Sequence, residues 1–181
     1  MTFEQRWKWA ESRGSLENIQ DYKELEYIYH LISGCESYLE IGSAEGNSLY
    51  ILAGSLKPNS KITYVDWNES HTREARLQSI NELSKEGFKT HNVHGDTRDL
   101  RSIEWAKGKY EVVLIDAGHS YEDVIQDARN YGPMATKYLL FHDINLPEVK
   151  QAFQEYQKET GLLAYTISNS NTFGFGIMEI K

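Results

Sequence analysis

The chain has 181 residues, an apolar content of 40% and a formal net charge of −8, from 27 acidic and 19 basic residues. This apolar fraction, with 12% aromatic residues, is enough to bury a core and excludes an intrinsically disordered chain. No Lys/Arg cluster is long enough to follow a phosphate backbone, so we expect no nucleic-acid partner. The length predicts one domain, residues 1–181.

The N-terminus and the single cysteine set expectations about location. Residues 1–9 carry charges among their aromatic side chains, so they match neither a signal peptide nor a membrane span. Cys35 has no second cysteine for an intramolecular disulfide, which suits a reducing compartment. We therefore expect a cytoplasmic protein with no membrane partner, and we leave a homo-oligomeric state open.

A helical extension, residues 1–36, precedes the first expected strand. It contains a short segment, Phe3 to Glu11, and a helix that begins at Asp21 with Glu24 in a capping-box-like position. In a nucleotide-binding α/β domain such an extension has a natural place over the carboxyl ends of the strands. A substrate lid and plain packing are both compatible with this pattern.

Strand-like and helix-like patterns alternate over residues 37–181, which predicts an α/β fold with a mostly parallel, doubly wound sheet of the Rossmann-like kind. Apolar residues recur at helical spacing between the strands, and Asn145 with Glu148 predicts the start of the last helix. The last two strands are expected to pair antiparallel. The seven expected strands are residues 37–41, 61–66, 88–93, 110–115, 138–142, 162–168 and 172–180.

A glycine-rich turn follows the first expected strand, where Glu40-Ile-Gly42 leads through Ser-Ala-Glu to Gly46. Glycines let the backbone turn sharply and approach a ligand, and the following helix offers free N–H groups to it. Such a turn also occurs merely for close packing. Asp66 strengthens the cofactor interpretation, because a carboxylate at the end of the second strand can accept hydrogen bonds from both hydroxyls of a ribose.

The pattern Glu40-x-Gly42-x-x-x-Gly46 with Asp66 resembles the first two motifs of class I S-adenosylmethionine (SAM)-dependent methyltransferases. Its glycine spacing differs from the Gly-x-Gly-x-x-Gly of dinucleotide dehydrogenases. In the family, the turn lies against the methionine half of the cofactor and the acid holds the ribose. The resemblance implies a cofactor site that includes Glu40, Gly42, Ser43, Ala44, Gly46, Asn47, Ser48, Asp66, Trp67, Asp96, Thr97 and Asp116.

The segment His94-Gly-Asp96-Thr97 resembles the family segment whose acid binds the adenine amino group. An acceptor has a physical purpose there, since the exocyclic amine is a donor. Asp96 could equally cap a helix that begins near Thr97, and the two roles are compatible.

The second half of the chain is similar to a methyltransferase-24-like, or cephalosporin hydroxylase-like, subgroup. That subgroup has an Ile-Asp-x-x-His-x-Tyr segment after strand four, here Ile115 to Tyr121, and a His-Asp pair ending strand five, here His142-Asp143. The similarity spans roughly residues 38–143. One departure is Pro133-Met-Ala-Thr-Lys137, where the family usually has a Lys-Pro-Gly-Gly turn.

Asp116, His119, His142 and Asp143 are the candidate catalytic residues, because the carboxyl ends of strands four and five meet in this topology. The set Asp116, His142 and Asp143 could hold Mg²⁺ or another divalent cation that acidifies a substrate hydroxyl. Without a metal, His119 or His142 could act as the general base. A purely structural role in caps and loops is the third interpretation. Metal-dependent relatives tend to place an acid or amide directly after the strand-five acid, where this chain has Ile144. Whether the site binds a metal therefore stays open.

We therefore expect SAM-dependent methyl transfer to an oxygen, or less favourably a nitrogen, of a small-molecule acceptor. Two alternatives are a non-catalytic SAM-binding domain and an NAD-dependent oxidoreductase on a similar fold. The Asp/His cluster argues against the first alternative. The glycine spacing and the antiparallel last strand argue against the second. The sequence does not specify the acceptor.

Overall fold

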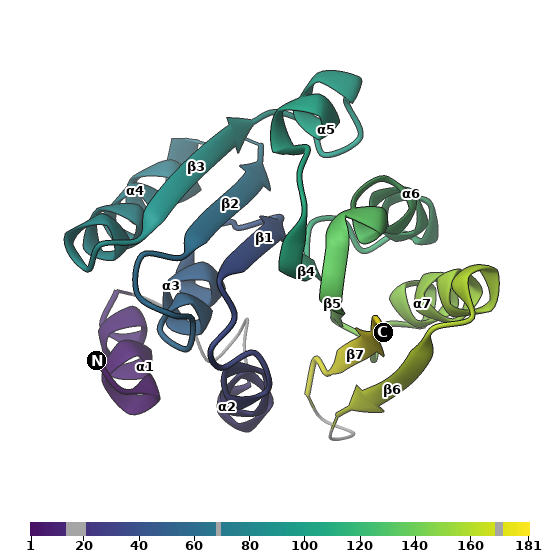
Figure 1. Ribbon diagram of the computed structural model, residues 1–181, viewed down its shortest axis with the longest axis horizontal. Helices are drawn as coiled ribbons and strands as arrows, with labels where there is room; N and C mark the ends of the chain where they lie inside the picture. Colours follow the sequence, from purple (N-terminus) through teal and green to yellow (C-terminus); the bar gives the residue numbers. More distant parts are fainter. Residues whose placement is uncertain (14–20, 68–69, 169–171) are drawn as a thin grey trace.

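A seven-stranded sheet forms the centre of the molecule in a computed structural model that describes residues 1–13, 21–67, 70–168 and 172–181 (Figure 1). The strand order is β3-β2-β1-β4-β5-β7-β6, and β7 runs antiparallel to both β5 and β6. The α/β fold predicted from the sequence, with its antiparallel last pair, is confirmed. The strands are β1 Ser37–Ile41, β2 Lys61–Asp66, β3 Lys89–His94, β4 Tyr110–Ile115, β5 Ala135–His142, β6 Leu163–Ile167 and β7 Phe175–Glu179.

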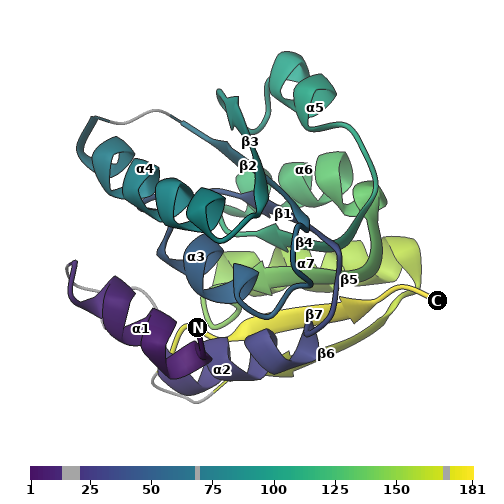
Figure 2. The same cartoon turned by 60° about the vertical axis from the view of Figure 1, so that its left-hand side comes forward.

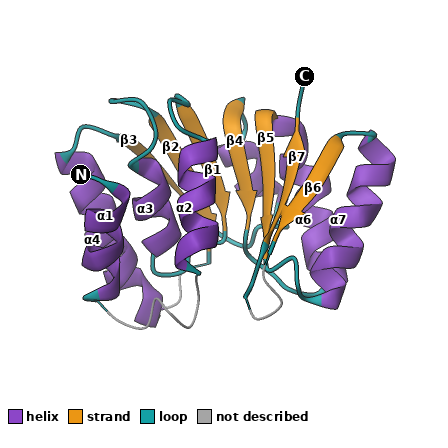
Figure 3. Cartoon of the chain, turned by 90° about the horizontal axis from the view of Figure 1, so that it is seen from below, coloured by secondary structure: helices purple, strands orange, loops and turns teal. Residues whose placement is uncertain are grey.

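Helices cover both faces of the sheet, as Figure 3 shows from below. The first face carries α1 Phe3–Glu11, α2 Tyr22–Leu31, α3 Asn47–Ala53 and α4 Ser70–Lys85. The second face carries α5 Leu100–Ala106, α6 Tyr121–Tyr131 and α7 Pro147–Thr160, with a 3-10 turn, Gly132–Met134, after α6. Each face has its own apolar core, because the central strands are buried on both sides.

The N-terminal extension packs beside α3 (Figure 2). Arg6 of α1 is 2% exposed, donates a hydrogen bond to the Tyr50 carbonyl oxygen at 2.8 Å and pairs with Glu86. After α1, the Arg13 guanidinium donates to the Ser79 hydroxyl on α4 at 2.6 Å. These contacts support plain packing for α1, and no described residue of α1 or α2 lines the cavity described below. Within the described ranges, no helix combines the length and apolar character needed to cross a membrane.

The two strands that differ most from their predicted bounds, by three residues at their starts, lie at the C-terminal side. β5 begins at Ala135, three residues earlier than expected, because the chain enters the strand directly from the 3-10 turn. β7 begins at Phe175 instead of residue 172, and residues 169–171 lie outside the described part of the chain.

Two predicted helix starts also differ. The prediction that Asn145 caps α7 is wrong: Leu146 is the N-cap and Pro147 follows, since proline at this position needs no donor partner. Glu148 instead accepts a hydrogen bond from the Tyr121 N–H of α6 at 3.0 Å.

The expectation of a helix that starts near Thr97 is likewise wrong. α5 begins at Leu100, and Asp99 caps it by accepting a hydrogen bond from the Arg101 N–H. Asp96 therefore does not cap α5, and its carboxylate belongs to the surroundings of the cavity.

Candidate active site

A cavity of about 310 Å³ opens at the carboxyl ends of β1, β2, β3 and β4. Ligands of open α/β sheets bind at this edge, and the volume falls within the range of small-molecule sites. The lining residues are Gly42, Ala44, Asp66, Trp67, Thr72, Gly95, Asp96, Thr97, Arg98, Asp116, Ala117, Gly118 and Asp123.

The turn between β1 and α3 forms one wall of the cavity. Gly42 has a φ of +84°, and a Cβ atom there would lie 2.4 Å from the Ala117 Cα atom and from the Asp116 carbonyl oxygen. Only glycine lets the ends of β1 and β4 approach so closely. Gly46, with a φ of +74°, is the N-cap of α3. Both glycines of the predicted motif are thus required by the backbone geometry.

Asp66, the last residue of β2, clamps this turn and also faces the cavity. Its Oδ2 atom accepts hydrogen bonds from the backbone N–H groups of Ser43 and Ala44, each at 2.6 Å. Its Oδ1 atom lies 3.0 Å from the guanidinium of Arg76 on α4. Arg76 is 5% exposed and donates to the Ala44 carbonyl oxygen at 2.7 Å. A buried arginine therefore fixes both the turn and the acid that was predicted to hold a ribose.

Glu40 lies behind the turn in a fully buried position on β1. The Ser48 hydroxyl donates to its carboxyl group at 2.9 Å, and the Tyr38 hydroxyl donates to the other oxygen. Burial raises the pKa of Glu40 to about 8. Glu40 and Ser48 do not line the cavity, so this geometry makes them a support for the turn.

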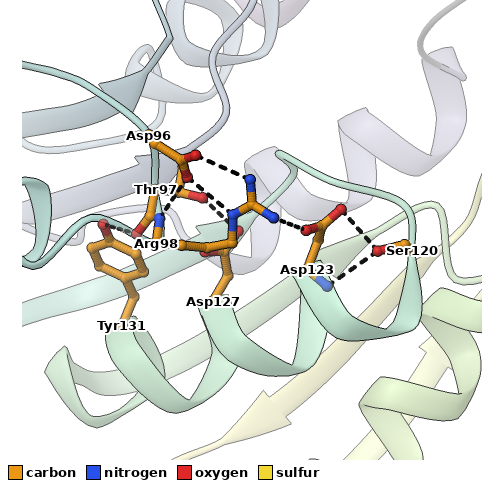
Figure 4. Close-up of polar contacts among 7 residues, drawn as sticks. All are labelled: Asp96, Thr97, Arg98, Ser120, Asp123, Asp127 and Tyr131. Atoms are coloured by element: carbon orange, nitrogen blue, oxygen red, sulfur yellow. Dashed lines mark hydrogen bonds and ion pairs between the residues drawn. The ribbon is translucent and has the colours of Figure 1, made fainter.

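Asp96 follows β3 at the opposite side of the cavity and is bound by Arg98 (Figure 4). The Arg98 guanidinium lies 3.0 Å from both Asp96 oxygens and 2.5 Å from Oδ1 of Asp123 on α6. The hydrogen bonds from Arg98 lower the pKa of Asp96. This pairing leaves Asp96 ionised, which keeps it a hydrogen-bond acceptor.

The four predicted catalytic residues form one connected cluster at the ends of β4 and β5. Nδ1 of His142 lies 2.9 Å from Oδ1 of Asp116 and 3.3 Å from Oδ2 of Asp143. Nε2 of His119 lies 2.8 Å from the same Asp143 oxygen. Asp143 has a φ of +57°, in the left-handed region, which aspartate adopts more readily than most residues with a side chain.

The two carboxylates hold His142 in its charged form. His142 is 3% exposed, and burial opposes its charge, but Asp116 and Asp143 raise its pKa to about 10. Although burial acts in the opposite direction, hydrogen bonds from His119 and His142 lower the pKa of Asp143. The hydrogen bond with Asp143 raises the pKa of His119, and burial raises the pKa of Asp116. The cluster is therefore an alternating array of carboxylates and imidazoles.

Three members of this cluster also meet the geometric requirement for a metal site. One ligand atom each of Asp116, His142 and Asp143 lies within 4.8 Å of the others. Two carboxylates and one imidazole are a donor set that fits a divalent cation. Such a cation would replace the proton of His142, since a ligating imidazole must be neutral.

Of the residues predicted to bind the cofactor, seven line the cavity: Gly42, Ala44, Asp66, Trp67, Asp96, Thr97 and Asp116. The others, Glu40, Ser43, Gly46, Asn47 and Ser48, lie in or behind the turn. Sequence reasoning missed Thr72, Gly95, Arg98, Ala117, Gly118 and Asp123. For Asp123 the sequence does contain an indication, because Ser120-x-x-Asp123 is a pattern typical of a helix start.

Comparison with protein families gives one match that covers most of this site. A family model described as a methyltransferase domain matches residues 39–144, which is more than half of the chain. Among curated proteins, Snaclec 5 of Bitis arietans is 28% identical over 85 residues. That alignment covers 43% of this chain and 56% of Snaclec 5, so the chain spans little more than half of that relative's length.

Solved structures share the whole fold at low sequence identity. A putative caffeoyl-CoA O-methyltransferase from Staphylococcus aureus superposes with a TM-score of 0.78 at 16% identity, over 100% of this chain and 93% of that one. The O-methyltransferase TomG from Streptomyces achromogenes, in complex with SAM, has a TM-score of 0.72 at 12% identity, over 99% and 89%. An O-methyltransferase from Bacillus cereus, in complex with S-adenosylhomocysteine (SAH), has a TM-score of 0.72 at 13% identity, over 99% and 90%. At these identities the likeness establishes the fold.

Proposed function

This chain belongs to a family of methyltransferase domains, and on that premise we propose that it binds SAM in the cavity and transfers its methyl group to an oxygen of a small molecule. One observation carries the proposal. The glycine turn at Gly42, the acid at the end of β2 and the 96–97 segment line the same cavity as Asp116. The predicted cofactor contacts and the first residue of the Asp/His cluster therefore share one space.

The adenosine half of the cofactor fits the walls formed after β2 and β3. Asp66 is held in place by Arg76. Its Oδ2 atom already accepts from the Ser43 and Ala44 N–H groups, so Oδ1 is the atom that can accept a hydrogen bond from a ribose hydroxyl. Trp67, 60% exposed at the cavity wall, offers an aromatic surface to the adenine ring. Asp96 is the acceptor for the adenine amino group. Gly42 and Ala44 then border the methionine half.

The acceptor reacts at the β4 side, beside Asp116, Ala117 and Gly118. Methyl transfer is a direct displacement at the sulfonium, so the protein has to align the acceptor oxygen and remove its proton. His119 is the better placed base, because its side chain is 57% exposed, whereas that of His142 is 2% exposed. Asp143 orients the His119 imidazole, as a carboxylate orients the base in other nucleophilic sites.

Asp116, His142 and Asp143 are the residues that would hold a divalent cation, given their donor set and spacing. A bound cation supplies positive charge that lowers the pKa of an acceptor hydroxyl. Asp143 then has two tasks, to ligate through one oxygen and to keep the His119 imidazole in place.

Ligand binding tests the first half of the proposal. SAM or SAH at 100 times its Kd is expected to raise the Tm by about 5–10 °C, whereas NAD leaves it unchanged. Stabilisation by NAD and not by SAM would contradict the proposal and favour an oxidoreductase. A protein that binds SAM but releases no SAH with any of a panel of phenols, catechols and alcohols would contradict methyl transfer to an oxygen of these acceptors and favour a non-catalytic SAM-binding domain.

A further inference from the structure

Three polar links tie the 95–98 segment after β3 to one face of α6 (Figure 4). The Thr97 hydroxyl donates to Oδ2 of Asp127 at 3.1 Å, and the Tyr131 hydroxyl donates to the Thr97 carbonyl oxygen at 2.7 Å. Arg98 reaches Asp123 at 2.5 Å. The three α6 residues are spaced four apart, so they lie on the same side of the helix. Two of the links converge on Thr97, which lines the cavity.

Asp127 is an unusual member of this face. It is 1% exposed, and its Oδ1 atom has no hydrogen-bond partner among the described residues. A buried carboxyl group with an unpaired oxygen costs folding free energy, and an apolar side chain would avoid that cost. Burial raises the pKa of Asp127 to about 7, the carboxylates of Asp123 and Asp96 add to the effect, and Thr97 and Arg98 oppose it. Buried polar atoms are almost always hydrogen-bonded in folded proteins, so the placement of this carboxyl group beside Thr97 calls for an explanation.

We propose that Asp127 and Tyr131 are positioning residues for the adenine end of the cofactor, acting through Thr97. Neither side chain lines the cavity, but together they fix the hydroxyl and the carbonyl oxygen of Thr97. The Tyr131 bond fixes the Thr97–Arg98 peptide, and the Asp127 bond fixes the Thr97 side chain. Together they set the position of Arg98, whose guanidinium binds both oxygens of the Asp96 carboxylate. This inference rests on the proposed function, because it assumes that SAM occupies the cavity.

The test compares the affinities of SAH and of adenosine in Thr97→Val, Thr97→Ser and a matched control, Thr136→Val. Thr136 lies at the amino end of β5 and donates one side-chain hydrogen bond, to the Tyr110 carbonyl oxygen. Thr97→Val is expected to weaken both ligands about tenfold, since it removes one hydrogen bond to a buried acid. Thr97→Ser restores the donor and is expected to stay within about twofold of the wild type, as is Thr136→Val.

The pH profile separates a positioning role from a structural one. Asp127→Asn keeps an acceptor for Thr97 but cannot ionise. SAH in the cavity displaces water from around Thr97, which lines it, so a bound ligand is expected to disfavour the ionised form of Asp127. The ratio of the wild-type Kd for SAH to that of Asp127→Asn is therefore expected to be near one at pH 6. It should rise above pH 7, by at most about tenfold per pH unit. Taking the ratio cancels the titration of SAH itself and of groups that do not interact with Asp127.

The outcomes are distinguishable. If the wild type binds neither SAH nor adenosine, the proposed function fails and this inference fails with it. If the wild type binds both and Thr97→Val matches Thr136→Val, only the inference is overturned. A loss of SAH affinity without a loss of adenosine affinity, or a Kd ratio that does not change with pH, also overturns it. Thermal unfolding of each variant verifies that the affinities refer to folded protein.

Discussion

Gly42→Ala is the sharpest test of the backbone geometry of the site. Two costs add at this position. The φ of +84° is unfavourable for a residue with a side chain, by about 1–2 kcal/mol. The new Cβ atom would also lie 2.4 Å from backbone atoms of Ala117 and Asp116, and overpacking of this kind costs about 1–3 kcal/mol or more. The expected loss in the free energy of unfolding is therefore about 2–5 kcal/mol.

Gly161→Ala is the matched control, because Gly161 also has a positive φ, +68°, but nothing lies within 4 Å of a Cβ atom there. It carries only the conformational cost of about 1–2 kcal/mol. Urea denaturation of the two variants measures the difference, and thermal unfolding of a chain of this length should separate them at about 2–4 °C per kcal/mol. If Gly42→Ala is no less stable than Gly161→Ala, the close approach of β1 and β4 is not as described. Among folded Gly42→Ala molecules, SAH affinity should also be lost, whereas Gly161→Ala retains it.

Arg76→Met leaves the Asp66 carboxylate without its cation, so it should lower the free energy of unfolding by about 3 kcal/mol and weaken SAH binding about tenfold by calorimetry. Unchanged SAH affinity would show that the clamp is not needed for binding. Glu40→Gln tests the raised pKa of Glu40. Up to its pKa of about 8, Glu40 keeps a proton in the folded wild type, whereas in the unfolded chain the carboxyl group loses it above the ordinary pKa of 4.5. Between pH 4.5 and pH 8, the free energy of unfolding of the wild type should therefore fall relative to that of Glu40→Gln, by up to about 1.4 kcal/mol per pH unit. Above pH 8 the difference between the two proteins should stay constant. A difference that does not change between pH 4.5 and pH 8 would refute the raised pKa of Glu40. Asp143→Asn should lower turnover about 100-fold while SAM affinity changes less than about threefold, and equal losses in both would place Asp143 in cofactor binding instead.

The sheet and the glycine turn could be predicted because both depend on local patterns. Alternating strand and helix periods specify the layers, and the right-handed crossover rule leaves few topologies for them. Gly42 and Gly46 were identified because only glycine fits such backbone positions. The convergence of Asp116 with His142 and Asp143 was also predictable. It follows from the neighbouring places of β4 and β5 in the sheet.

The side-chain partners of the predicted acids could not be read from the sequence. Arg76 lies in the middle of α4, and nothing in its local spacing indicates that it reaches Asp66. The sequence does not indicate the ion pair of Arg98 with Asp123 for a related reason, since it joins two segments that come together only in the folded chain. The start of α7 was mistaken because Asn145 and Glu148 fit a capping pattern, whereas Pro147 starts the helix without one.

Acidic side chains dominate the carboxyl edge of the sheet, and the nature of their partners divides this edge into two parts. Asp66 and Asp96 are paired with arginines, Arg76 and Arg98, whose guanidinium groups do not lose their proton in proteins. Asp116 is paired instead with the imidazole of His142. An imidazole can exchange its proton for a metal ion. The adenosine side of the proposed site thus has permanent ion pairs that fix geometry. The β4–β5 side has a replaceable positive charge, which is what a centre that must handle the proton of an acceptor requires.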